Sequence, residues 1–330
     1  MERRWGSPDA ATAAVRVAVR HVLGDRSPGD LVLVACSGGA DSLALAAATA
    51  VEAPASGLRA GAVVVDHGLQ PGSAEVATRA AHSLRSLGLD PVDVVSVEVT
   101  SSGDGPEAAA RTARYAALDD AADRHGAAVV LLGHTRDDQA EQVLLGLARG
   151  SGTRSLSGMP AARGRVVRPL LGVTREQTRA SCAAEGLTPW DDPMNEDPRF
   201  TRVRARSALA DLERALGPGV AAALARTASL LRDDAELLDG LADDAVTALG
   251  PGPWAVEALA GIPRALRTRV WRRLLVAAGA PAGRLGARHT DACDRLLTAW
   301  RGQGPVHTPG DLRVARSGGR VTIAPHDRVD

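Results

Sequence analysis

Short apolar runs alternate with longer stretches of helical periodicity in the first half of the chain. The apolar runs are Leu31–Ala35, Gly61–Val65, Val92–Val99 and Ala127–Leu132. The helical stretches between them are Ser42–Ala53, Ser73–Leu87 and Pro106–Arg124. Continuous Val/Leu runs are typical of strands buried on both faces of a parallel sheet. The alternation predicts an α/β fold, a doubly wound parallel sheet with right-handed crossovers.

The second half of the chain follows a different pattern. Residues 150–192 are rich in Gly, Ser and Arg and predict loops, one short strand and a helix at Arg175–Glu185. Residues 201–300 predict a mainly helical domain, and two alternating runs around Gly318-Gly319 predict a small C-terminal β-hairpin. We therefore expect a catalytic domain over residues 1–212 and a helical domain over residues 213–330.

Composition narrows the class of protein. The chain has 330 residues, 45% of them hydrophobic but only 2% aromatic, so Leu, Val and Ala must fill the core. Its 39 basic residues balance 39 acidic ones, and every basic residue is arginine. No stretch approaches the ~20 apolar residues that cross a membrane, and the N-terminus does not resemble a signal peptide. We expect a cytoplasmic protein with no membrane partner.

The segment Ser37-Gly38-Gly39-Ala40-Asp41-Ser42 joins the first predicted strand to a helix. Glycines let the backbone approach a ligand, and the N–H groups and dipole at a helix start favour an anion. This pattern predicts a phosphate-binding loop. A Walker A loop is excluded because it needs lysine. The same letters at Ser317-Gly318-Gly319 precede no helix, and we interpret them as a turn.

Asp41 is the unusual member of this loop, since a carboxylate repels phosphate. One interpretation is that Asp41 binds a Mg²⁺ ion that also binds the phosphates. The alternative is that Asp41 caps the helix. The residue types do not choose between these two roles.

A second group of polar residues follows the fourth predicted strand, where a doubly wound sheet binds its ligands. The segment begins at His134, and Thr135 with Asp138 has the spacing of a helix capping box. Capping explains the presence of one carboxylate but not of the others. The sequence therefore favours a site for Mg²⁺ or a cationic substrate. Its members are His134, Asp137, Asp138 and Glu141.

Arginines gather in two further places. Glu107, Arg111 and Arg114 have i,i+4 and i,i+3 spacing on the helix before the fourth strand, which also suits a solvated charged face. Four more follow a Pro/Asp turn region and predict either a solvated surface or contacts with phosphates. These four are Arg199, Arg202, Arg204 and Arg206.

Several motifs in order resemble one known family. Ser-Gly-Gly-x-Asp-Ser resembles the PP-loop of the ATP pyrophosphatase superfamily. From Val32 to about Glu213 the chain is similar to the tRNA(Ile)-lysidine synthetase family. The shared motifs are this loop, "VVVDHGLQPGS", "PEAAARTARY", "GHTRDDQAE", "LLGLARGSGTRSLSGM", "RPLL" and "DDPMN".

The resemblance implies an ATP-dependent ligase with two steps. ATP adenylates the wobble cytidine of the isoleucine tRNA with a CAU anticodon, and free L-lysine then displaces AMP to leave lysidine. Codon specificity changes from AUG to AUA. The loop Ser37–Ser42 would bind ATP, and Asp41 and Asp138 would bind Mg²⁺. A homodimer is one of the oligomeric states left open.

The same resemblance implies roles for the remaining polar residues. Arg114, with Arg111 as a second candidate, would stabilise charge on the α-phosphate of ATP. The lysine-binding residues would be His134, Asp137 and Glu141. The tRNA-binding residues would be Arg199, Arg202, Arg204 and Arg206.

Other adenylating PP-loop enzymes are the alternatives. A tRNA thiolase needs catalytic or cluster-binding cysteines, and Cys36, Cys182 and Cys293 are scattered. An amide ligase similar to NAD synthetase has a similar loop but does not predict an arginine-rich second half. A different class of alternative is a non-catalytic nucleotide sensor. Such a sensor needs no acidic residues after the fourth strand, so their presence argues against it.

Overall fold

The computed structural model describes residues 9–66, 68, 70, 72–97, 106–150 and 152–326, with the backbone alone for 106–108. Parts of the motif "VVVDHGLQPGS", the end of the third predicted strand and the side chain of Glu107 lie outside this description. The chain divides into two compact units that meet between Leu230 and Leu231. No helix in the described ranges is long and apolar enough to cross a membrane.

The first unit contains a six-stranded sheet with the order β3-β2-β1-β4-β6-β5, in which only the β5–β6 pair is antiparallel. Its strands are β1 (Leu31–Ala35), β2 (Arg59–Asp66), β3 (Val92–Ser96), β4 (Ala127–Leu132), β5 (Ala162–Arg163) and β6 (Val166–Val167). Its first helices are α1 (Ala10–Leu23), α2 (Ala40–Ala55), α3 (Ser73–Ser86), α4 (Pro106–His125) and α5 (Arg136–Ala148). These bounds confirm the expected strands and helices to within a few residues.

One short helix precedes β5, and the remaining elements of this unit follow β6 in the sequence. They are α6 (Thr153–Leu156), the 3-10 turn η1 (Pro169–Gly172), α7 (Arg175–Ala184), η2 (Pro193–Glu196) and α8 (Thr201–Leu216). Helix α9 (Val220–Leu249) runs from the first unit into the second. The predicted domain boundary at residue 212 lies within α8, before the point where the two units meet.

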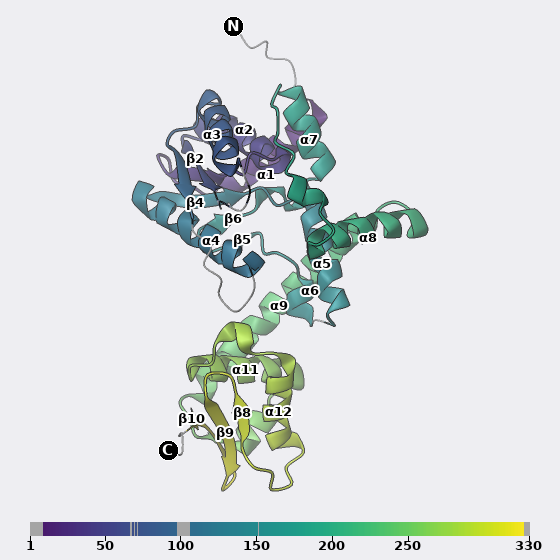
Figure 1. Ribbon diagram of the computed structural model, residues 1–330. Helices are drawn as coiled ribbons and strands as arrows, with labels where there is room; N and C mark the ends of the chain where they lie inside the picture. The colour runs from purple at the N-terminus through teal and green to yellow at the C-terminus, as the bar shows by residue number, and fades with distance from the viewer. Residues whose placement is uncertain are drawn as a thin grey trace. The chain divides into compact units, whose positions relative to one another are not determined.

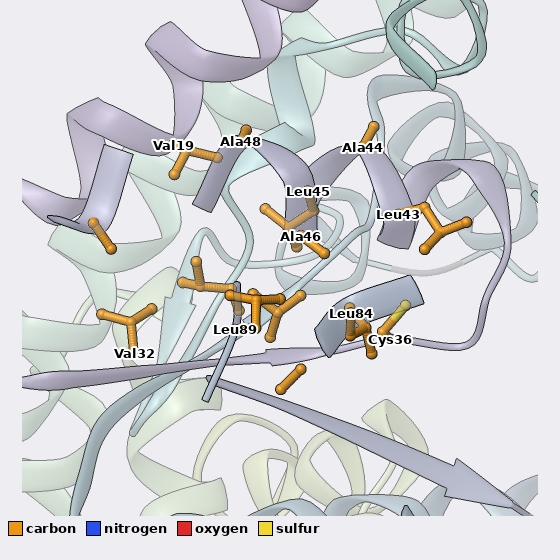
Figure 2. Packing of buried hydrophobic residues seen from close by; sticks show 14 of the residues in the cluster. Val19, Val32, Cys36, Leu43, Ala44, Leu45, Ala46, Ala48, Leu84 and Leu89 are labelled. Atoms are coloured by element: carbon orange, nitrogen blue, oxygen red, sulfur yellow. The ribbon is translucent and has the colours of Figure 1, made fainter. Parts of the chain in front are cut away.

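Helices cover both faces of the sheet, as a doubly wound fold requires (Figure 1). Val32 and Val34 of β1 pack with α1, α2, α3 and α7, whereas Leu31 and Leu33 pack with Leu118, Ala121 and Ala122 of α4. Figure 2 shows the first of these cores, where Leu and Ala side chains of α2 lie over Val32 and Cys36. Alternate residues of one strand therefore fill two cores.

The second unit packs α10 (Val256–Ala260), α11 (Arg264–Ala277) and α12 (Ala287–Thr298) beside a four-stranded antiparallel sheet. The strand order is β7-β10-β9-β8, formed by β7 (Trp254–Ala255), β8 (Val306–Thr308), β9 (Leu312–Ser317) and β10 (Arg320–Pro325). A short turn η3 (Ala282–Arg284) precedes α12. The hairpin of β9 and β10 confirms the expected turn at Gly318-Gly319, and β7 and β8 extend it on both sides.

A buried ion-pair network joins α1 to α2. Glu52 is 3% exposed at its side chain and accepts hydrogen bonds from Arg16 Nε at 2.6 Å and Arg20 Nε at 2.7 Å. Burial raises the pKa of Glu52, but the two arginines outweigh it and hold this pKa below its ordinary value. The charged form of Glu52 therefore stabilises the folded chain.

We expect Glu52→Gln to lower the free energy of unfolding by about 1.5–3 kcal/mol at neutral pH, because hydrogen bonds to a charged group are lost. In the wild-type protein, the stabilisation by ionised Glu52 is complete above pH 4.5, the ordinary pKa of this carboxyl in the unfolded chain. The stabilisation is lost as the pH falls through the lower pKa that Glu52 has in the folded chain. Urea unfolding at several pH values measures this difference. Equal acid destabilisation of both proteins would show that Glu52 contributes no charge effect.

Candidate active site

A cavity of about 560 Å³ opens at the carboxyl ends of β1, β2 and β4. This is the edge at which an open α/β sheet binds its ligands, and the volume suits a small-molecule site. The end of β4 lies very close to the start of α2: a Cβ atom on Gly133 would lie 3.0 Å from the backbone of Asp41. A side chain at this position would crowd the backbone of α2, so glycine suits the approach. The loop after β1 therefore shares one cavity with His134 and Asp138 of the group after β4, whereas Asp137 and Glu141 do not line it.

The loop Ser37–Ser42 has the predicted strand-loop-helix arrangement. Gly38 has φ +83°, a conformation that favours glycine, and its carbonyl accepts a hydrogen bond from Trp190 N at 2.9 Å. The Ser42 hydroxyl accepts from Ser37 N at 3.2 Å and donates to Gly39 O at 3.0 Å. The first N–H groups of α2 have no acceptor within the helix and are available to an anion.

Asp41 does not cap α2. The N-cap residue is Gly39, and no side chain bonds the helix start, so the capping alternative is wrong. Instead, Oδ1 of Asp41 accepts a short hydrogen bond from Thr178, and Oδ2 lies 3.9 Å from Arg175 Nε. Burial raises the pKa of Asp41, and the neighbouring carboxylate of Asp138 acts in the same direction. This environment favours a cation beside Asp41.

Asp138, in contrast, does cap its own helix. Its Oδ2 accepts from Thr135 N at 2.8 Å and from the Thr135 hydroxyl at 3.0 Å, which confirms the capping box. Its Oδ1 accepts from Arg175 Nη2 at 2.9 Å. Burial alone raises the pKa of Asp138, but Arg175 and the bonds from Thr135 hold it below its ordinary value. Both oxygens of Asp138 already have partners.

Arg175 is the main site residue that the sequence did not reveal. Its guanidinium donates to Asp138 at 2.9 Å and to Glu141 at 3.2 Å, and its backbone N donates to Asp137 Oδ2 at 2.8 Å. Arg175 is the first residue of α7, where the helix dipole disfavours a cation. An arginine at this unfavourable position indicates that an acidic residue elsewhere in the fold compensates its charge. This was the signal in the sequence that could have predicted the role of Arg175.

Glu141 is almost fully buried, with 3% of its side chain exposed. Its Oε1 accepts from Arg175 and from Arg206 Nε at 2.9 Å. Its Oε2 is buried and has no hydrogen-bond partner among the described residues. Asp138, Arg175 and Arg206 line the cavity and Glu141 does not. Glu141 therefore has an unused acceptor behind two bonded guanidinium groups.

His134 lies at the end of β4 and lines the cavity. Burial, together with the charges of Arg114, Arg168 and Arg202, lowers the pKa of His134 to about 3, although Asp138 acts in the opposite direction. The ring is therefore neutral above that pH. Its buried Nδ1 has no partner among the described residues.

We expect the His134 ring to stay neutral throughout the range from about pH 5 to 8, whereas an unperturbed imidazole titrates near 6.5. A pH titration of the ring nitrogen resonances by NMR, assigned with a His134→Gln variant, measures this directly. Protonation of His134 between pH 5 and 7 would mean that the arginines and burial do not control its charge.

The four arginines of the Arg199–Arg206 segment do not share one surface. Arg199 pairs with Asp197 at 2.6 Å, and Arg204 donates to the carbonyls of Pro198 and Arg199. Arg206 instead points into the cavity and bonds Glu141. Their contact with tRNA stays a prediction.

Asp41 fits a magnesium ion better than Asp138 does. No group of three or more His, Cys, Asp and Glu in the described ranges has the arrangement of a metal site. A nucleotide-bound Mg²⁺ needs only one or two protein carboxylates, because water and phosphate oxygens complete its shell. Oδ2 of Asp41 meets this requirement, whereas Asp138 meets it only after Arg175 leaves its Oδ1.

Comparisons with known proteins identify the family of this chain. Residues 12–213 match the family model of the PP-loop domain, and residues 255–322 match that of the TilS substrate binding domain. A tRNA(Ile)-lysidine synthase from Thermobifida fusca is 59% identical over 96% of this chain and 98% of its own length. One from Streptomyces coelicolor is 54% identical over 96% and 99%, respectively.

A solved structure shares the fold of this chain. The U34-tRNA thiolase NcsA from Methanococcus maripaludis has a TM-score of 0.56 and 18% identity, over 67% of this chain and 80% of that one. At this identity the likeness concerns the fold alone. The sequence relatives decide the family: the chain belongs to the tRNA(Ile)-lysidine synthases, a family of PP-loop ligases that use ATP.

Proposed function

We propose that this protein joins free L-lysine to C2 of the wobble cytidine in the isoleucine tRNA with a CAU anticodon. The observation that carries the proposal is one cavity lined by the loop after β1 and by Asp138, with the buried Glu141 bonded to Arg175 and Arg206 of the lining. The loop suits a nucleotide, and the acidic group suits a substrate ammonium. Identity of 50–59% with several lysidine synthases over nearly the whole chain supports the same reaction.

In the first step the cytidine O2 attacks the α-phosphorus of ATP, and the bond to the β-phosphate breaks. The N–H groups of the loop Ser37–Ser42 hold the departing pyrophosphate. Asp41 would hold Mg²⁺, which supplies positive charge to the phosphates when bound. Arg114 lines the cavity and has a buried Nε without a partner in the described ranges, so it is our candidate for the α-phosphate.

In the second step the ε-amine of lysine attacks C2, and AMP leaves with the oxygen that it activated. The amine must first lose a proton. Glu141 has an unused carboxylate oxygen for the ammonium, and neutral His134 has an unused Nδ1. Asp137 is the third candidate, although its Oδ2 already accepts from Arg175 N.

Access to Glu141 is the remaining requirement. Its Oε1 accepts from Arg175 and Arg206, which line the cavity, whereas Glu141 does not. For lysine to contact Glu141 from the cavity, one of the two guanidinium groups must move.

The experiment that tests the proposal follows AMP. The protein is incubated with α-labelled ATP, lysine and a transcript of the isoleucine tRNA. We expect adenylated tRNA without lysine, and AMP release only when both tRNA and lysine are present. A transcript with uridine at the wobble position is the matched control. AMP release that does not depend on lysine would contradict the proposal.

A further inference from the structure

Four arginines form a second charged group beside the cavity. This basic cluster consists of Arg111 and Arg114 from α4, Arg168 before η1, and Arg202 from α8. Three of them surround Tyr115: Arg168 and Arg111 donate to its hydroxyl at 3.0 and 3.3 Å, and Arg114 Cζ lies 5.6 Å from the ring centre. Arg202 is near enough to lower the pKa of both Arg114 and His134.

Within the described residues, no acid neutralises the charges of the basic cluster. Among the described side chains, none of the four arginines forms an ion pair with a carboxylate, in contrast to Arg175 and Arg206. Arg168 is only 4% exposed, and the Nε atoms of Arg114 and Arg168 are buried without partners in the described ranges. Burial lowers the pKa of Arg114, and the charges of Arg111 and Arg202 lower it further.

Unpaired guanidinium groups at such close range oppose folding, because burial removes water from the charge and the charges repel one another. A bound anion removes both costs. Phosphate matches the planar donors of arginine better than other common anions do. The basic cluster therefore has the chemistry of a phosphate site.

The position of the basic cluster indicates which phosphate it receives. Only Arg114 lines the cavity, whereas Arg111, Arg168 and Arg202 do not. Arg111 is exposed to solvent. The departing pyrophosphate of ATP is assigned above to the loop at the start of α2, which contributes nothing to the cluster, and the α-phosphate is assigned to Arg114 alone. A phosphate at Arg111 and Arg202 would lie outside the cavity, which fits a polymer whose base enters the cavity.

We propose that Arg111 and Arg202 of the basic cluster bind one backbone phosphate of the tRNA directly beside the wobble nucleotide, while Arg114 faces the cavity. Arg168 is a positioning residue: it bonds Tyr115 and the carbonyl of Pro160, and the tyrosine in turn orients Arg111. This inference rests on the proposed function, because the phosphate is part of that substrate. Binding of this phosphate fixes the register of the anticodon loop, while the base itself is recognised in the cavity.

The experiment uses the native anticodon stem-loop RNA and two modified RNAs. In each modified RNA, one of the two phosphates that flank the wobble nucleotide is a neutral methylphosphonate. Binding of Arg202→Gln and of Arg111→Gln to all three RNAs is measured, which gives a double-mutant cycle for each flanking phosphate. We expect either substitution to weaken binding of the native RNA about 10- to 100-fold. The same substitution should have little further effect on one of the two methylphosphonate RNAs. The affinity for ATP should stay within about twofold.

Arg204→Gln is the matched control, because Arg204 lies on the same helix and bonds only its own segment. The effect of Arg204→Gln on RNA affinity should simply add to the effect of the methylphosphonate. Additive effects for Arg202 and Arg111 at both flanking positions would overturn the proposal. Loss of ATP affinity with unchanged RNA affinity would assign the cluster to the α-phosphate and overturn it equally. If the wild-type protein does not adenylate the tRNA, the proposed function itself fails.

Discussion

Asp41→Asn is expected to slow adenylation of the tRNA by about 10²- to 10³-fold, the usual cost of removing one charge-stabilising group from an active site. The substitution keeps the size of the side chain and removes a negative charge that lines the cavity. The start of α2 should not change, because Gly39 is the N-cap and no side chain bonds the helix start. Release of pyrophosphate with tRNA and saturating ATP, without lysine, measures this step.

Thr178→Val is the matched control for Asp41. It removes the hydroxyl that bonds Asp41 Oδ1 and leaves the carboxylate charge in place. We expect a loss of about tenfold or less, in line with one hydrogen bond. Pyrophosphate release at the wild-type rate by the Asp41→Asn variant would remove Asp41 from the metal site.

Glu141→Gln is expected to form adenylated tRNA but to consume it slowly, with a lysine requirement raised tens- to thousands-fold. Loss of one partner of a buried charge pair typically costs about 2–5 kcal/mol. The carboxylate already satisfies Arg175 and Arg206 through Oε1, and its second oxygen is unused. The measurement is the accumulation of labelled AMP–tRNA and its decay after lysine is added.

Asp137→Asn is the matched control for Glu141. Its carboxylate accepts a backbone N–H from Arg175, and an amide oxygen can accept the same bond. We therefore expect a small effect on lysine. If Glu141→Gln already fails at adenylation, Glu141 belongs to the ATP site. If lysine consumes the intermediate at the wild-type rate, Glu141 only supports Arg175 and Arg206, and Asp137 becomes the better candidate.

The parts of the fold that local patterns control were predictable from the sequence. Strands β1 and β4 have the expected bounds because continuous Val and Leu residues leave little choice of structure. The loop Ser37–Ser42 was recognisable because its glycines, its strand and its helix are adjacent in the sequence. Strands β7 and β8 were missed since two or three residues carry no periodicity, and their partners lie elsewhere in the chain.

The site was only partly predictable for the same reason. His134, Asp138 and Glu141 lie close together in the sequence, so their spacing indicated a cluster. Arg175 and Arg206 join that cluster from positions 34 and 65 residues away from Glu141 in the chain. Nothing in the segment around Arg206 distinguishes it from Arg204, which stays outside. Only the tertiary fold decides which arginine meets an acid.

The close approach of Gly133 to Asp41 has a consequence for how this enzyme class can diversify. The residue that follows β4 and the first turn of α2 approach each other through backbone atoms, with no side chain between them to shorten or lengthen. The distance between these two backbone segments is therefore harder to change by substitution than the reach of a side chain. We expect a change in the preferred length of the amine to arise instead on α7 and α8, whose Arg175 and Arg206 reach the acids through long, adaptable side chains.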